Sequence, residues 1–247
     1  MFRTQLPRIY ELRDLIADPT SPDAYFQNFD SNVQDSLHVR QIYVHWEKDL
    51  QGLDDDAWEF LKSEASPYSI HKDRGGRGWQ QLFDILNQAR AYNYLKTIGS
   101  SGVRFIPPAK QHSTRTPDLE GVLDSARILC EVKTINIRDN EVRARKGFRV
   151  RGIATQLDDG FLRKLYSVIT NAKDQMEAYD ATSEVRYYVH VNLCFDDFLG
   201  ECKEAYFRQI DQYLSDSPTL GVHVIIHNEQ TPFHKALAMT TATVVNA

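Results

Sequence analysis

Cysteine is scarce in this sequence, and the few that occur are far apart. The 247 residues contain three, Cys130, Cys194 and Cys202, and no two are spaced as in a metal-binding or redox motif. An odd number of widely separated cysteines argues against a disulfide framework and against a zinc site. Cys130 and Cys194 lie in runs typical of strands, so we interpret them as buried thiols.

Long apolar runs are missing as well. No stretch approaches the roughly 20 apolar residues of a membrane-spanning helix, and the start, Met1 to Thr4, lacks the apolar run of a signal peptide. We therefore expect a cytoplasmic protein with no membrane partner. Hydrophobic residues at 42% and charged residues at 26% are usual for a globular protein.

The chain also lacks an excess of positive charge, since its net charge is -5. This argues against a protein that coats nucleic acid without specificity. It does not exclude an enzyme that acts on nucleic acid, because the local distribution of charge matters more than the sum. A centre that collects cations requires acidic residues.

The first 70 residues have the pattern of short helices. Asp54 to Asp56 precede an apolar helical run and are typical of a capped helix start. A glycine-rich stretch from Arg74 to Gly78 then interrupts the chain. We predict a helical N-terminal region over 1–74 and a second domain over 75–247.

After this break the apolar periodicity becomes regular. A helical repeat stops at Gly99, and two later strand patterns are joined by a tight turn near Asp124 and Ser125. The first strands form an antiparallel meander, and helices that cross over to the next strand follow it. This order predicts an α/β fold with a mixed central β-sheet flanked by helices. The predicted elements are a helix at 79–98, strands at 103–106, 118–123 and 127–135, a helix at 159–179, a strand at 185–195, a helix at 201–215 and a strand at 222–227.

Two acidic residues and a lysine occur at the centre of this region. Glu131 and Lys133 are two apart on a predicted strand and therefore share a face, while the opposite face is apolar. Charged groups on so hydrophobic a strand are costly unless they pair or serve chemistry. If the turn leaves an even number of residues unpaired, Asp118 joins them on the same face.

Such a cluster suits a divalent cation. Carboxylate oxygens of Asp118 and Glu131 are preferred ligands of Mg²⁺ or Mn²⁺, and the Val132 backbone carbonyl is a third candidate ligand. A metal held there would polarise a phosphoryl oxygen and activate water, with Lys133 orienting that water or balancing developing charge. Glu120 is a rival ligand, although a solvated strand position is the more ordinary interpretation.

Pro117-Asp118 followed by Glu131-Val132-Lys133, between a helix and a long helix, resembles the PD-(D/E)xK or restriction-endonuclease-like nuclease superfamily. The resemblance covers about Trp79 to Phe195. It implies a restriction-endonuclease-like core in which the Asp and the Glu bind divalent metal and the Lys assists the attacking water. Carried over, these roles fall on Asp118, Glu131 and Lys133.

The helices that flank the motif supply auxiliary candidates. Many members of the superfamily have a glutamate on the preceding helix, where this chain has Gln88, and Asp84 one turn earlier is a substitute. In the resembling families the long helix after the motif often contributes a polar residue, and Gln175 and Lys164 are the candidates here. Simple solvation of the helix edge is the alternative for both.

A basic segment directly follows the catalytic strand pattern. It contains six cations against Asp139 and Glu141 and is expected to contact the phosphates of a nucleic acid, or else to be a solvated loop. Its candidate residues are Arg138, Arg143, Arg145, Lys146, Arg149 and Arg151. His223 and His227 share a strand face, but without a third ligand nearby they are interpreted as ordinary sheet residues.

The sequence thus predicts a magnesium-dependent nuclease that hydrolyses phosphodiester bonds, with DNA favoured over RNA as the partner. The alternative is an inactive nuclease-fold module that binds nucleic acid or a protein. An unrelated acid/base enzyme lacks a second catalytic motif. The sequence leaves open endonuclease or exonuclease action, specificity, biological role, the number of metals, and the oligomeric state, for which a homodimer is one option.

Overall fold

The structure is a computed structural model of the full chain. It describes residues 2–16, 18, 21, 24–70, 79–109, 115–135, 156–180, 182, 184–193, 203–217, 220–228 and 231–237. Contacts divide the chain into two compact units, Met1–Phe105 and Ile106–Ala247. The boundary predicted at residues 74 and 75 lies outside the described residues, and the contacts group residues 79–105 with the N-terminal helices.

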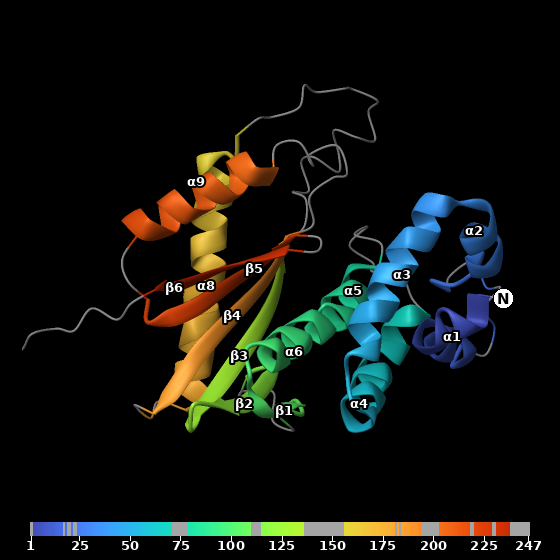
Figure 1. Ribbon diagram of the computed structural model, residues 1–247, viewed down its shortest axis with the longest axis horizontal. Coiled ribbons are helices and arrows are strands. Elements are labelled where there is room, and N and C mark those ends of the chain that lie inside the picture. The colour runs from blue at the N-terminus through green and yellow to red at the C-terminus, as the bar shows by residue number, and fades with distance from the viewer. Residues whose placement is uncertain are drawn as a thin grey trace, which may run out of the picture. The chain divides into compact units, whose positions relative to one another are not determined.

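The first unit is helical, as the sequence predicted (Figure 1). A single strand, β1, belongs to it because Phe105 stacks on Phe60 and Tyr92 with ring centroids 5.3 and 5.6 Å apart. Its elements are η1 (Phe2–Thr4), α1 (Pro7–Asp14), α2 (Phe29–Asp35), α3 (Leu37–Gln51), α4 (Asp55–Ala65), η2 (Ser66–Ser69), α5 (Gln80–Leu86), α6 (Gln88–Thr97) and β1 (Ser101–Phe105).

Acidic side chains satisfy the starts of two helices in this unit, α4 and α1. The Asp54 side chain accepts the Ala57 N–H at 2.9 Å, which confirms the predicted cap of α4. The buried Glu47 on α3 accepts the backbone N–H groups of Arg8 at 3.2 Å and Ile9 at 3.0 Å. Because the first N–H groups of a helix have no partner within it, Glu47 fixes the start of α1 against α3.

The second unit contributes five neighbouring strands to a mixed sheet, in the order β2-β3-β4-β5-β6. The outer pairs are antiparallel, whereas β3 pairs β4 and β4 pairs β5 in parallel. Parallel neighbours need crossovers, and the two helices supply them. The elements are β2 (Leu119–Leu123), β3 (Ala126–Ile135), α8 (Asp159–Tyr179), β4 (Val185–Leu193), α9 (Lys203–Asp216), β5 (Val222–Asn228) and β6 (Thr231–Leu237).

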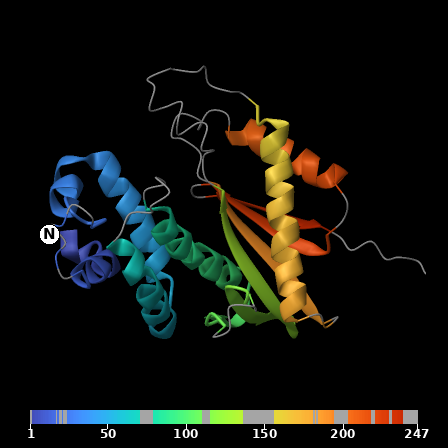
Figure 2. The same ribbon diagram turned by 180° about the vertical axis from the view of Figure 1, so that it is seen from behind.

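The core of this unit lies between the sheet and helices α8 and α9, and Figure 2 shows α8 lying across this face of the sheet. The apolar stripe of α8 is buried, as its 3.6-residue periodicity predicted. Leu162, Leu165, Ile169, Ala172 and Met176 form this stripe. It packs on the alternating residues Leu129, Ile135, Tyr187, Val189, Val191 and Leu193 of β3 and β4.

The mixed sheet and most elements agree with the sequence prediction, with two differences. The helix predicted over 79–98 is divided at Asn87 into α5 and α6, and its stop at Gly99 is confirmed by a φ of +90°. The end of the strand predicted at 185–195 lies outside the described residues. Strand β6 was not predicted, because Pro232 interrupts the strand pattern and is compatible only with an edge position.

Close packing of α3 on α6 generates a stability prediction. A Cβ atom added at Gly52 would lie 2.2 Å from Oδ1 of Asn93, whose amide is tied to the Asp49 carbonyl at 2.7 Å. We expect Gly52→Ala to lower the free energy of unfolding by about 1–3 kcal/mol, as overpacked cores do. Urea unfolding measures this, and in an Asn93→Ala background the cost should largely disappear. Equal costs in both backgrounds would contradict the contact.

Candidate functional site

Strand β3 carries the two charged residues that the sequence singled out. Glu131 and Lys133 lie on the face of β3 that also carries the buried Leu129 and Ile135. Glu131 is 3% exposed, and the Lys133 side chain retains 32% of its exposure. The Lys133 ammonium forms an ion pair with Oε1 of Glu131. The Glu131 carboxylate is therefore buried against the face of the sheet, whereas the Lys133 side chain reaches solvent.

Asp118 is brought to the same place by the start of β2. A two-residue turn with positive φ at Asp124 and Ser125 aligns Leu119 with Cys130, so that Asp118 comes next to Glu131. The Asp118 carboxylate accepts the Val132 N–H at 2.7 Å. At the end of the hydrogen-bond ladder between β2 and β3, the Asp118 side chain thus takes the place of a backbone carbonyl as the acceptor of an N–H of β3.

Helix α8 adds a fourth polar side chain, and it is the predicted Gln175. Its Nε2 donates to Oε2 of Glu131 at 2.9 Å and to the Thr116 carbonyl at 2.9 Å. Gln175 lies beside the buried stripe of α8, so the packing of the helix brings its amide to the sheet. The contact to Thr116 was not predicted, because a backbone carbonyl leaves no signal in side-chain identity.

Among the described residues, Lys133 supplies the positive charge next to the two carboxylates. Burial raises the pKa of Asp118 to about 6, although the Val132 N–H and the Lys133 charge oppose the change. Burial and repulsion from Asp118 raise the pKa of Glu131 to about 8, against Lys133 and Gln175. One ammonium therefore does not compensate the pair, and the site favours the uptake of a proton or of a cation.

These residues fit a divalent cation chemically. Two carboxylates are hard oxygen ligands, and the Val132 carbonyl points to the same edge of β3 as its N–H, because both groups of a strand residue share one side. The described residues contain no group of three or more histidine, cysteine or acidic side chains placed to hold a metal ion. Beyond two acids, the remaining positions of a metal would belong to a carbonyl, water and substrate.

Other candidates from the sequence lie elsewhere. Glu120 forms an ion pair with Arg127 at 2.6 Å, and Arg127 also binds Asp180 at 2.6 Å, so this acid belongs to a separate network at the end of α8. Lys164 is exposed on α8, about three turns before Gln175. It does not take part in the cluster around Glu131.

Two further sets of candidates remain predictions. Asp84 on α5 and Gln88 on α6 belong to the first unit, and their auxiliary role stays a prediction. The basic segment with its six candidate cations falls within residues 136–155, outside the described residues. Its contact with nucleic acid therefore also stays a prediction.

A second cluster of polar side chains lies on the sheet face opposite α8. Tyr188 stacks on His223 and His190 on His227, with ring centroids 4.6 and 5.9 Å apart. Asn192 is 1% exposed, and neither of its amide atoms has a hydrogen-bond partner among the described residues. The alternation of β4 was predicted, but the burial of its polar side was not. The histidines are sheet residues, as interpreted from the sequence.

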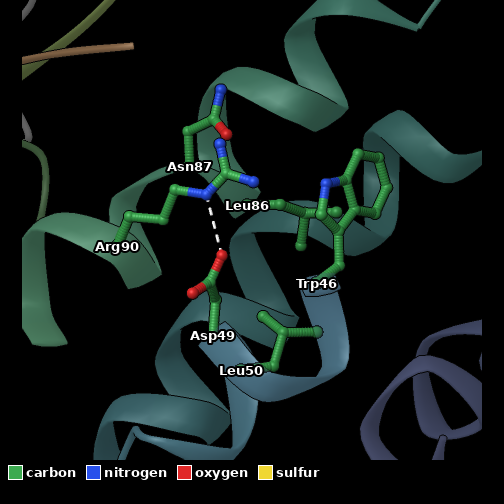
Figure 3. Close-up of a pocket in the computed structure, with 6 residues that line it drawn as sticks. All are labelled: Trp46, Asp49, Leu50, Leu86, Asn87 and Arg90. Atoms are coloured by element: carbon green, nitrogen blue, oxygen red, sulfur yellow. Dashed lines mark hydrogen bonds and ion pairs between the residues drawn. The ribbon is translucent and has the colours of Figure 1, made fainter. Parts of the chain in front are cut away.

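A small pocket lies in the first unit (Figure 3). It is lined by Trp46, Asp49, Leu50, Leu86, Asn87 and Arg90, and the Arg90 guanidinium donates to Asp49 at 2.7 Å across it. The pocket encloses about 190 Å³, counting its open side. Pockets for small molecules usually enclose roughly 300–1,000 Å³, so this hollow is too small to indicate a cofactor site.

Comparison with known proteins adds little to this description. No family model matches the sequence, and no curated protein matches it. Among solved structures, the chain is similar to SfsA of Pyrococcus furiosus in complex with Ca²⁺, at 10% identity and a TM-score of 0.20, over 64% of this chain and 62% of that chain. The chain spans less than two thirds of that protein, and a likeness this low assigns neither a family nor an activity.

Membrane association was not expected from the sequence. Within the part of the chain that the structure describes, no helix combines the length and the apolar character needed to cross a bilayer.

The electrostatics of Glu131 predict how stability depends on pH. An acid whose pKa is higher in the folded state binds its proton more tightly when folded, so stability falls as pH rises from its ordinary 4.5 to about 8. In metal-free buffer we expect a loss on the order of 2 kcal/mol between these limits. Glu131→Gln should remove most of this dependence.

Urea unfolding at pH 5 and pH 8 with EDTA measures the effect. Glu120→Gln is the matched control, because this acid is on the neighbouring strand and pairs with Arg127 instead. The control should retain the dependence of the unaltered protein. A Glu131→Gln variant that loses as much stability as the unaltered protein would contradict the assigned electrostatics.

Proposed function

We propose that this protein is a metal-dependent nuclease that hydrolyses phosphodiester bonds, with DNA as the favoured substrate. The observation that carries the proposal is the pair of acids, Asp118 and Glu131, held together beside Lys133 with too little positive charge to balance them. A buried group of acids with raised pKa values is typical of functional sites. Mg²⁺ or Mn²⁺ is the cation that such oxygen ligands favour.

The order of elements supports the same conclusion. A β-hairpin, a crossover helix and a parallel strand surround the motif Pro117-Asp118 and Glu131-Val132-Lys133. This order agrees with the restriction-endonuclease-like core that the motif implies, and we include that core in the proposal. Gln175 fits the auxiliary position on the long helix.

Each residue has a distinct task in this proposal. Asp118, Glu131 and the Val132 carbonyl would hold the cation, which when bound would polarise the phosphoryl group and acidify a water molecule. Lys133 is partly exposed and carries its ammonium next to Glu131, where it can orient water and balance charge on the substrate. The apolar strand face around them excludes bulk water and strengthens these interactions.

The second candidate is a nuclease fold without activity that binds nucleic acid or a protein. One observation favours it: the cluster in the second unit contains two acids, and the helix position that bears a glutamate in many relatives of the motif is Gln88 here. The two candidates differ in whether the bound nucleic acid is cut.

Cleavage of plasmid and oligonucleotide substrates tests the proposal. We expect activity with Mg²⁺ or Mn²⁺ and none with EDTA. Asp118→Asn and Glu131→Gln should lower turnover at least about 100-fold by removing a charged ligand, and Lys133→Ala should lower turnover while retaining metal affinity, because an ammonium is not a ligand. Calorimetric titration with Mn²⁺ measures the affinity.

Glu120→Gln is again the control and should cut like the unaltered protein. Mn²⁺ affinity retained in both Asp118→Asn and Glu131→Gln would refute the site. Nucleic-acid binding without cleavage under any metal would favour the inactive module. DNA and RNA substrates compared side by side would establish which polymer is preferred.

The basic segment gives a separate prediction about binding. Neutralising Arg143, Arg145 and Lys146 together should weaken binding of DNA and reduce the slope of log affinity against log salt by about 3, one for each lost phosphate contact. Fluorescence anisotropy in EDTA between 50 and 200 mM salt measures the slope without cleavage. An unchanged slope would remove this segment from the interface.

A further inference from the structure

We infer that the polar sheet face opposite α8 holds a second metal site, in which His190, His227 and Asn192 bind a divalent transition-metal ion such as Zn²⁺. This site is independent of the acid cluster and of the proposed nuclease. It takes a different class of ion, because imidazole suits Zn²⁺, whereas the oxygen ligands around Glu131 suit Mg²⁺.

Two adjacent strands bring the three side chains together. In the parallel register of β4 and β5, Asn192 pairs with His227, and His190 lies two residues before Asn192 on the same face. The rings of His190 and His227 have centroids 5.9 Å apart. With Zn–N bonds of about 2.0–2.1 Å, two imidazoles that share one ion have ring centroids about 5–6 Å apart. The ring planes are inclined by 28°, and rotation about χ2, a broad torsion, aims one nitrogen of each ring at a common point.

The amide of Asn192 is the observation that points to a ligand at this place. The side chain is 1% exposed, and neither Oδ1 nor Nδ2 has a hydrogen-bond partner among the described residues. A buried polar group without a partner destabilises the fold, and in native proteins such a group usually binds water or an ion. An ion held at Oδ1 would remove this cost.

The two histidines can bind an ion and still keep other contacts. An imidazole has two ring nitrogens, and metal-binding histidines use one for the ion while the other bonds to a neighbour. His190 is 1% exposed and His227 is half-buried, so the side of His227 is the one open to solvent. Three neutral protein ligands and a water complete the tetrahedral arrangement of zinc.

This set differs from the pair that the sequence offered. His223 and His227 share a face of β5, but His223 pairs with Tyr188 and stacks on it with ring centroids 4.6 Å apart. The partner of His227 comes from β4 instead. With two histidines and one amide, the set agrees with the finding that the described residues contain no metal-binding group of three or more histidine, cysteine or acidic side chains. His223 is therefore an internal control.

Titration of the full chain with Co²⁺ tests the inference. Asp118→Asn together with Glu131→Gln first removes the acids, which would bind the same ion. We expect this double variant to bind one Co²⁺, measured by calorimetry and by the visible absorption of Co²⁺, and excess Mg²⁺ should not displace it. Urea unfolding should require more urea with Co²⁺ than with EDTA, because an ion that binds only the folded state stabilises it.

His227→Gln and His223→Gln, each made in the double variant, form a matched pair, since both histidines are half-buried on β5. Loss of groups that only orient ligands weakens metal binding roughly 10- to 100-fold, so loss of a ligand at His227 should weaken Co²⁺ binding by at least about 100-fold. His223→Gln should bind Co²⁺ as tightly as its parent. Asn192→Leu should be more stable than its parent in EDTA, because the unsatisfied amide is gone, and should gain little from Co²⁺.

The outcomes separate this site from the proposed nuclease. A double variant that binds no Co²⁺ would overturn the site and leave the nuclease standing, because cleavage is measured with the acids intact. Equal Co²⁺ affinity in His227→Gln and His223→Gln would also overturn it, and a trapped water would then account for Asn192. Absence of Mg²⁺-dependent cleavage in the unaltered protein, with Co²⁺ bound as expected, would refute the nuclease and support this site.

Discussion

A carboxylate buried on an apolar strand is the constraint around which the second unit is arranged. Glu131 is 3% exposed in the middle of β3, where Leu129 and Ile135 on the same face belong to the core. Burying a charge without partners costs several kcal/mol, and two neighbouring side chains reduce this cost. Lys133 provides charge, and Gln175 provides a hydrogen bond from α8.

The compensation is incomplete, and the remaining imbalance has a chemical meaning. Asp118 lies close enough to raise the pKa of Glu131, so the site without a cation stores electrostatic repulsion. Repulsion of this kind lowers the stability of the folded protein and raises its affinity for a cation. Functional sites commonly lose stability in return for function in this way. The hairpin of β2 and β3 brings the two acids next to each other, and the Val132 N–H holds Asp118 there.

The polar side chains of the first unit have a different role. Its polar groups mostly serve local structure, as where Glu47 holds the start of α1 and Arg90 pairs with Asp49. These interactions satisfy helix ends and join helices. The unit is thus accounted for by packing and capping, whereas the second unit contains charges that packing alone does not explain.

The sequence by itself determined the elements with strong periodicity. The long helix α8, the hairpin of β2 and β3, and the alternation of β4 followed from the spacing of apolar residues, and the motif around Asp118 and Glu131 was visible in residue identity. Strand β6 did not follow, because Pro232 interrupts its strand pattern. The division between α5 and α6 did not follow either, because the helical repeat of apolar residues continues across Asn87.

Only the tertiary structure decided how the candidate residues combine. It brought Gln175 onto Glu131 and Thr116, gave Glu120 to Arg127, and buried Asn192 on the far face of the sheet. The restriction-endonuclease-like core, the nuclease activity and the basic segment stay predictions. The physical reason is that periodicity reports which face of an element is apolar, whereas a site depends on distances between elements remote in the chain, and these are fixed only when the cores pack.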